Sequence, residues 1–306
     1  MSGERLEVEV TRLVVFSGAV HYTANREYVA HAGFVREMDI WARVFPEILV
    51  VGLKSSGPPL PDSIAYSEKN IRVDFFGAAR NTSGIRGKLV LLKTSPPFFA
   101  KAYGLLRPGD VVMARGPEAV GFLGALVAWV HRKPRFARYT SQWTSFPQES
   151  IQHKAQKWFY RHVFGGPVAI YGQSEPRFPH LVPFFTSSIT RQEWEAAGKL
   201  LQKDKTPRRL IYVGRLSLNK GVDTLLHCVR FLLDQNYDVV LDIVGDGSEK
   251  SNLVRTAGEL GITHAVTFHG RKGRSELDKL YSEAYCLVHA SRSEGFGKVL
   301  LEGMTF

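Results

Sequence analysis

Two glutamates eight positions apart flank a glycine-rich segment near the end of the chain. Glu294 precedes this segment, which contains Phe296, and an apolar helix is expected to begin near Lys298. The first turn of a helix leaves backbone amides unpaired, so the amides of Gly297 to Val299 would attract an anion. Glu302 lies more than one turn inside that helix, so the two carboxylates would hold different parts of one elongated ligand. Two solvated surface charges are the alternative interpretation.

A second loop combines a glycine with two cations. Gly214 ends an apolar run and is followed by Arg215, and Lys220 lies just before a segment of helical periodicity. A glycine allows the backbone to turn, and two cations at the start of a helix suit a diphosphate. Two solvated charges in an ordinary loop are equally compatible with this pattern.

A third loop contains Gly245 and Gly247 after another apolar run. It is not a dinucleotide-binding fingerprint, because Lys250 occupies the position of the third glycine in G-x-G-x-x-G. A tight turn that leads into a helix explains these two glycines as well as a ligand does.

The segments that must position these loops alternate between strand-like and helix-like patterns. After Pro207 we predict strands at 210–214, 238–245, 265–269 and 285–290, and helices at 222–233, 253–260 and 277–284. Before Pro207 we predict strands at 12–16, 48–53, 88–92, 110–114 and 136–140, with helices at 28–44 and 118–129. Such alternation implies parallel, doubly wound sheets. We therefore predict an α/β fold with two Rossmann-like domains, residues 1–206 and 207–306, joined by a linker at 199–207, with a ligand in the cleft that they face.

The composition is that of a folded globular protein, with 44% hydrophobic and 23% charged residues. The net charge of +11 is unevenly distributed along the chain. Before Pro207 there are 27 basic and 17 acidic residues, whereas from Pro207 onward there are 13 basic and 12 acidic residues.

The two cysteines, Cys228 and Cys286, are too few for a disulfide framework or a zinc site, which favours a cytoplasmic location. The N-terminus lacks a signal-peptide pattern, and the longest apolar run, Ala119–Val130, is too short to cross a bilayer.

Four short motifs, taken together, resemble a known family. They are Gly214-Arg215 with Lys220-Gly221, Val244-Gly245-x-Gly247, Phe268-x-Gly270, and Ser291-x-Ser293-Glu294-Gly295-Phe296-Gly297 with Glu302. In this order and spacing they resemble the nucleotide-sugar domain of retaining glycosyltransferases with the GT-B fold, the glycosyltransferase group 1 family, family 4. The resemblance covers about 100 residues, from Arg208 to the end of the chain.

The resemblance implies roles for these residues. Arg215 and Lys220 would hold the donor diphosphate, and Glu294 would accept hydrogen bonds from the donor sugar. The amides of Gly295 to Val299 would face phosphate and sugar oxygens, and Glu302 would bind the ribose hydroxyls. The expected catalytic residues are Glu294, Arg215 and Lys220, and the expected donor site also includes Gly214, Gly245, Gly247, Arg271, Gly295, Phe296, Gly297, Lys298 and Val299.

The resemblance also implies chemistry that needs neither a cofactor nor a metal. Two cations and a helix N-terminus would stabilise the charge of the leaving nucleoside diphosphate. The sequence has no Asp-x-Asp pair of the kind that holds a diphosphate-bound metal. Retention in such enzymes is described as front-face attack, so no protein nucleophile is expected.

The first domain would face the acceptor, a glycan or a lipid-linked glycan. The family often has a histidine after the strand at 136–140, but Gln142 and Trp143 stand there in this chain. His21, in a loop after the first strand, is a candidate substitute, although a solvated or capping histidine is the simpler interpretation.

Two basic segments of the first domain suggest a partner. Arg132–Arg138 and His153–His162 mix cations with aromatic side chains, which suits an anionic lipid surface. The protein would then be peripheral at the inner membrane face. No nucleic-acid-binding motif accompanies the charge, so nucleic acid is not expected, and a solvated basic face is the default interpretation.

The family's second domain continues beyond the helix that carries the second glutamate, whereas this chain stops at Phe306. We therefore expect a truncated, incomplete second domain whose last strand has an unpaired edge. Three alternatives stay open: an inactive nucleotide-binding fragment, an oxidoreductase or methyltransferase that uses the Gly245–Gly247 turn, and a nucleic-acid-binding protein.

Overall fold

The computed structural model describes residues 10–78, 97–146, 149–185, 189–200, 208–292, 294 and 296–306. The chain divides into two compact units, Met1–Phe185 and Thr186–Phe306. The sequence placed the boundary between residues 206 and 207. The unit boundary lies earlier because helix α5 (Arg191–Leu200) packs against helix α8 (Arg274–Glu283) of the second unit. The linker expected at 199–207 lies mostly outside the described residues.

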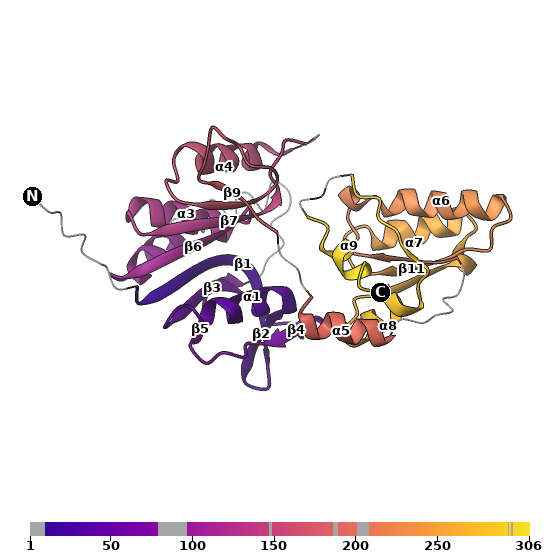
Figure 1. Cartoon of the computed structure of the whole chain (residues 1–306), viewed down its shortest axis with the longest axis horizontal. Helices are drawn as coiled ribbons and strands as arrows, with labels where there is room; N and C mark the ends of the chain where they lie inside the picture. Colours follow the sequence, from indigo (N-terminus) through magenta and orange to yellow (C-terminus); the bar gives the residue numbers. More distant parts are fainter. Residues whose placement is uncertain are drawn as a thin grey trace, which may run out of the picture. The chain divides into compact units, whose positions relative to one another are not determined.

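The first unit is built on a nine-stranded sheet (Figure 1). Five neighbouring strands of its parallel part run in the order β3-β1-β6-β7-β8, with β5 paired beside β3 and β9 beside β8. A short antiparallel extension, β2 and β4, pairs with the second half of β1. The strands are β1 (Arg12–Ala24), β2 (Glu27–His31), β3 (Ile48–Lys54), β4 (Ser63–Ala65), β5 (Ile71–Ala78), β6 (Asp110–Gly116), β7 (Arg135–Gln142), β8 (Val168–Tyr171) and β9 (Leu181–Pro183).

Helices bury both faces of this sheet. Helix α1 (Ala32–Ala42) packs through Phe34, Val35 and Met38 on alternate residues of β1 and β3. Helix α3 (Ala119–Val130) covers the opposite side of the same strands, and residues 97–105, which are also helical, pack there. Helix α4 (Ile151–His162) lies against β7 and β8. The strands and helices predicted at 48–53, 110–114, 118–129 and 136–140 are confirmed within a few residues, and the strand predicted at 12–16 is confirmed at its start but continues to Ala24.

The helix predicted at 28–44 is wrong in its first turn, because Tyr28 to His31 belong to strand β2. Asn25 and Arg26 both have positive φ, as a two-residue type I′ hairpin turn requires, and the turn joins β1 to β2. The apolar residues of this stretch fit the spacing of a helix and that of a strand equally well. Pairing with β1 makes it a strand. The strand predicted at 88–92 lies outside the described residues.

His21 belongs to the core of the first unit and lies within β1 rather than in a loop after it. Its Nδ1 lies 3.2 Å from the Ala19 carbonyl oxygen, and its Nε2 lies 2.7 Å from the Tyr66 hydroxyl. An Nδ1–H donor and an Nε2 acceptor satisfy both contacts with a neutral ring. Burial lowers the pKa of His21 to about 4.

The second unit is a smaller sheet of parallel strands in the order β12-β11-β10-β13. Its strands are β10 (Arg209–Val213), β11 (Val240–Val244), β12 (Val266–Gly270) and β13 (Cys286–Leu287), and its helices are α5, α6 (Val222–Asp234), α7 (Lys250–Glu259), α8 and α9 (Lys298–Gly303). Strand-to-helix alternation after Pro207 is therefore confirmed, although β13 has only two residues.

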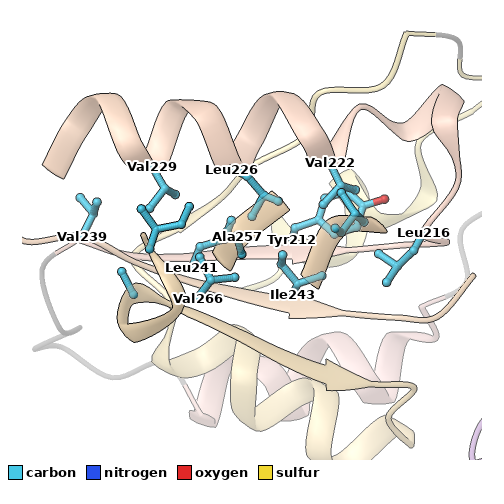
Figure 2. Close-up of a cluster of buried hydrophobic side chains, with 13 residues drawn as sticks. Tyr212, Leu216, Val222, Leu226, Val229, Val239, Leu241, Ile243, Ala257 and Val266 are labelled. Atoms are coloured by element: carbon cyan, nitrogen blue, oxygen red, sulfur yellow. The ribbon is translucent and has the colours of Figure 1, made fainter. Parts of the chain in front are cut away.

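Alternation of side chains places two apolar clusters on the two faces of this sheet. Figure 2 shows Tyr212, Leu241 and Ile243 of the strands beneath Leu226 and Val229 of helix α6. A second cluster, on the other face, joins Ile211, Val213 and Val244 to helices α8 and α9. Figure 1 shows α6 and α7 on one side of the sheet and α8 on the other. This double covering is that of a Rossmann-like domain.

Glycines allow the loops at the carboxyl ends of these strands to pack against one another. Gly221 has φ +62°, and a Cβ there would overlap the Ala290 carbonyl oxygen. A Cβ at Gly245 would overlap the Gly214 carbonyl oxygen. The loop after β10 is therefore in backbone contact with the loops after both β11 and β13.

Lowering the pH from 6.5 to 4 should cost stability through His21. The unfolded histidine binds a proton near pH 6.5, whereas the native ring stays neutral down to about pH 4. The free energy of unfolding should therefore fall through this window by about 3 kcal/mol, as 1.36 kcal/mol per pKa unit implies. Urea unfolding of wild type and His21→Gln at several pH values measures the difference. The exposed His227→Gln variant should keep the wild-type slope, and a wild-type slope in His21→Gln would refute this account.

Replacing Gly221 with alanine should weaken the second unit. A positive φ costs a non-glycine residue about 1–3 kcal/mol, and the overlap with Ala290 adds to that cost. We expect faster amide hydrogen exchange in β10 and α6. The matched control is Gly258→Ala in helix α7, where a Cβ meets no atom within 4 Å and alanine should stabilise the helix by about 1 kcal/mol. Equal exchange in the two variants would contradict the close approach.

Candidate functional site

Three of the loops named from sequence are connected by backbone hydrogen bonds at one edge of the second unit's sheet. The Gly214 amide donates to the Val244 carbonyl (3.0 Å), and the Gly245 amide donates to the Gly270 carbonyl (2.8 Å). The amide of Leu216 donates to the Asp246 carbonyl (3.0 Å). The carboxyl ends of β10, β11 and β12 therefore form one continuous surface, which is where open parallel sheets bind ligands.

The loop after β13 adds Glu294 to this surface. The Lys220 Nζ donates to Glu294 Oε2, so the two residues form an ion pair although they are 74 positions apart in the chain. The Ser291 hydroxyl lies 3.4 Å from the same oxygen. Sequence reasoning assigned Lys220 to a diphosphate and Glu294 to sugar hydroxyls. The structure places the two groups against each other, so a ligand at this point meets a cation and a carboxylate together.

His289 also belongs to this group, and sequence reasoning missed it. Its Nε2 lies 3.3 Å from Glu294 Oε2, and its ring stacks on Tyr212 at 6.5 Å between centroids. Burial raises the pKa of Tyr212, and the nearby Glu294 carboxylate raises it further. The sequence predicted that His289 lies inside the strand at 285–290, whereas β13 ends at Leu287, so His289 lies two residues beyond the strand, where the glycine-rich loop begins.

Arg215 and Arg271 are the exposed cations of the surface. Among the described residues, no carboxylate forms an ion pair with the Arg215 guanidinium, whereas the Arg215 backbone carbonyl accepts a hydrogen bond from the Tyr212 hydroxyl (3.1 Å). Arg271 follows Gly270 and lies near Asp246. The amide of Gly247 donates to the Asp246 carboxylate (2.8 Å), and this bond lowers the pKa of Asp246, with Lys250 and Arg271 lowering it further. The edge of the sheet therefore presents positive charge around a fixed carboxylate.

Helix α9 begins at Lys298, as predicted, with Gly297 at its N-cap. The Lys298 amide already donates to the Phe296 carbonyl (2.9 Å), so one of the amides expected to face a ligand has a partner. Val299 packs inward on the cluster shared with α8. Gly295 lies outside the described residues.

Glu302 lies one turn further along α9, close to Tyr281 of helix α8. Burial raises the pKa of Tyr281, and the Glu302 carboxylate contributes to the shift. Glu294 lies in the loop before α9, where its carboxylate is paired with Lys220. The two carboxylates therefore have different side-chain neighbours, and their binding to different parts of one ligand stays a prediction.

The structure places the first-unit candidates differently. His21 is fully buried, as described above, and Trp143 is 1% exposed, with its Nε1 donating to the Glu175 carboxylate (2.6 Å). Gln142 ends β7 and donates to the Thr144 hydroxyl (3.0 Å). Two of these three side chains therefore contribute to packing in the first unit, and only Gln142 is partly accessible.

Many cations of the basic segments are occupied within the first unit. Arg135 donates to the Phe164 carbonyl (2.6 Å), Arg138 is buried against Glu37, and Lys157 is buried in an ion pair with Glu149. Arg161 pairs with Glu175 at 2.8 Å. These side chains do not form an open basic patch.

The described part of the chain contains no cluster of three or more His, Cys, Asp or Glu residues that is suited to a metal ion. In the same part, no helix is both long enough and apolar enough to cross a membrane.

Comparisons with known proteins find a family that the second unit resembles. Residues 195–306 match the model of the family "Glycosyl transferases group 1". The chain is 33% identical over 117 residues to a D-inositol 3-phosphate glycosyltransferase of Mycolicibacterium gilvum, which is 38% of this chain and 26% of that protein. It is 26% identical over 199 residues to an alpha-D-kanosaminyltransferase of Streptomyces kanamyceticus, which is 59% of this chain and 50% of that protein. The chain therefore covers half or less of the length of these relatives.

Solved structures show the same architecture. The structure of Anabaena HepE in complex with UDP and glucose aligns over 97% of this chain and 78% of its own, with a TM-score of 0.62 and 18% identity. Sucrose-phosphate synthase from Thermosynechococcus elongatus aligns over 96% and 79%, with a TM-score of 0.63 and 21% identity. Identities this low establish the fold alone. The chain therefore has the GT-B fold of two Rossmann-like units, and its residues 195–306 are similar to the glycosyltransferase group 1 family.

Proposed function

We propose that this protein transfers a sugar, with retention, from a nucleotide diphosphate donor to a glycan or lipid-linked acceptor. The observation that carries the proposal is the pairing of Lys220 with Glu294 at the carboxyl edge of the sheet, in a unit that matches the group 1 family. The loop that carries Lys220 also carries the exposed Arg215. A cation suits a phosphate, and a carboxylate suits sugar hydroxyls. Anabaena HepE, which shares the fold, was solved with UDP and glucose.

In the proposed reaction Arg215 and Lys220 stabilise the diphosphate as it leaves. Their charge opposes the negative charge that develops on the bridging oxygen, and fixed cations need little reorganisation in the transition state. Lys220 is held by Glu294 in this structure, so the two groups would bind phosphate and sugar at adjacent points of the same donor. Glu302 would hold the ribose, one helical turn further along α9.

Retention follows in this proposal from front-face attack, with the acceptor approaching the side of the sugar that the diphosphate leaves. The proposed charge stabilisation uses the side chains of Arg215 and Lys220. The acceptor is assigned to the first unit. Membrane docking is not part of the proposal, because Arg138 and Lys157 are buried in internal ion pairs.

The proposal predicts a specific pattern of nucleotide affinities. Arg215→Ala should weaken UDP binding about 10–100-fold, the value of one charge-assisted contact, and should weaken UMP binding less. Glu302→Ala should weaken UDP and UMP about equally, because both contain the ribose. Isothermal titration of the purified chain measures these affinities, with Arg255→Ala on helix α7 as a control that leaves them unchanged.

Equal UDP affinity in wild type, Arg215→Ala and Glu302→Ala would refute the assignment of the site. Wild-type UDP binding without donor hydrolysis or transfer would instead favour an inactive nucleotide-binding protein.

A further inference from the structure

Arg292 joins the two loops that carry Lys220 and Glu294. Its backbone amide donates to the Asn219 carbonyl (2.8 Å). Its guanidinium donates to the Leu218 carbonyl from Nη1 (2.6 Å) and to the Asp223 carboxylate from Nη2 (2.5 Å). Three hydrogen bonds therefore connect one residue of the loop after β13 to the loop after β10 and the first turn of helix α6.

We propose that Arg292 is a positioning residue that sets the direction of the Lys220 amine toward the donor diphosphate. This inference rests on the proposed function. Lys220 lies between Asn219, which accepts the Arg292 amide, and Gly221, which packs against Ala290. Both neighbours of Lys220 are thus anchored to the same loop, which also supplies Glu294 two residues after Arg292.

The pattern of contacts requires a guanidinium. One planar group reaches a carbonyl and a carboxylate with two different nitrogens, which a lysine ammonium does not reproduce in the same geometry. The Arg292 and Asp223 side chains are each about half exposed, at 51% and 46%, so their Coulomb attraction is screened and contributes little to stability. The contacts therefore act on orientation, and their loss should change binding more than folding.

The discriminating variant is Arg292→Lys, which keeps the charge and removes the paired contacts. If Arg292 positions Lys220, then Arg292→Lys and Arg292→Ala should both lower the ratio of UDP to UMP affinity, by about three- to tenfold. Asp223→Asn, which removes the charge from one of the two side-chain contacts, should lower the ratio by a smaller factor. UMP affinity should stay within about twofold of wild type, since a single phosphate relies less on the second cation.

A double-mutant cycle with Lys220→Ala separates positioning from direct contact with the ligand. In a Lys220→Ala background the Arg292→Ala change should have no further effect on the UDP to UMP ratio. Additive effects would show that Arg292 itself contacts the diphosphate and would overturn the inference. A wild-type ratio in Arg292→Lys would overturn it too, as would equal losses for UDP and UMP.

The control is the exposed pair Arg230 and Asp234 on helix α6, four residues apart, where Arg230→Lys should leave both affinities unchanged. Thermal unfolding of each variant establishes that the chain is folded, and Asp223→Asn supplies a second test if Arg292→Ala does not fold. Failure of wild type to bind UDP more tightly than UMP would refute the proposed function and this inference with it. Preserved discrimination in wild type and in Arg292→Lys would refute this inference alone.

Discussion

The close approach of backbone to backbone at the carboxyl edge of the second unit is the constraint on which the candidate site depends. Gly245 lies against the Gly214 carbonyl, and Gly221 lies against the Ala290 carbonyl. A Cβ at either position would overlap a backbone carbonyl oxygen. A change of side-chain rotamer could not relieve that overlap, so the loops themselves would have to move apart. Lys220 and Glu294 belong to two of these loops, so their pairing depends on the close approach that the glycines allow. The glycines of the motifs therefore have a structural role in the packing of these loops, independent of any ligand.

Many charged side chains of the first unit form ion pairs with one another. The first unit carries the basic excess of the sequence, yet Arg12 forms a paired contact with Asp110 at 3.0 and 2.7 Å, and Glu37 accepts both Arg115 and Arg138. A buried charge must be paired, since leaving it alone in the interior is costly. A count of basic residues consequently overstates the positive surface that is open to a partner. In the second unit, which is nearly neutral, Arg215 is exposed at the carboxyl edge of the sheet.

Much of the fold could be read from local pattern, and the exceptions have physical causes. Strands β10, β11 and β12 of the second unit are short apolar runs that end at a glycine, which identifies them without tertiary information. Strand β2 was read as the start of a helix because Tyr28 and Val29 fit either periodicity, and the pairing with β1 across Asn25 and Arg26 decides between them. His21 was read as a loop residue because β1 continues well beyond its apolar core. Its polar atoms are satisfied by Ala19 and Tyr66, and neither contact is visible in the sequence around it.

The amino-acid sequence by itself determined the order of elements from β10 to α9, the candidate loops and the family that they resemble, because each of these depends on residues within one short segment. Only the tertiary structure decided which of those residues meet. Lys220 and Glu294 are 74 positions apart, and Arg292 and Asp223 are 69 positions apart. Their contacts follow from the adjacency of β10 and β13 in the sheet. That adjacency is a property of the packed sheet and not of any one segment, so the partners of the site residues emerge only when the chain is folded.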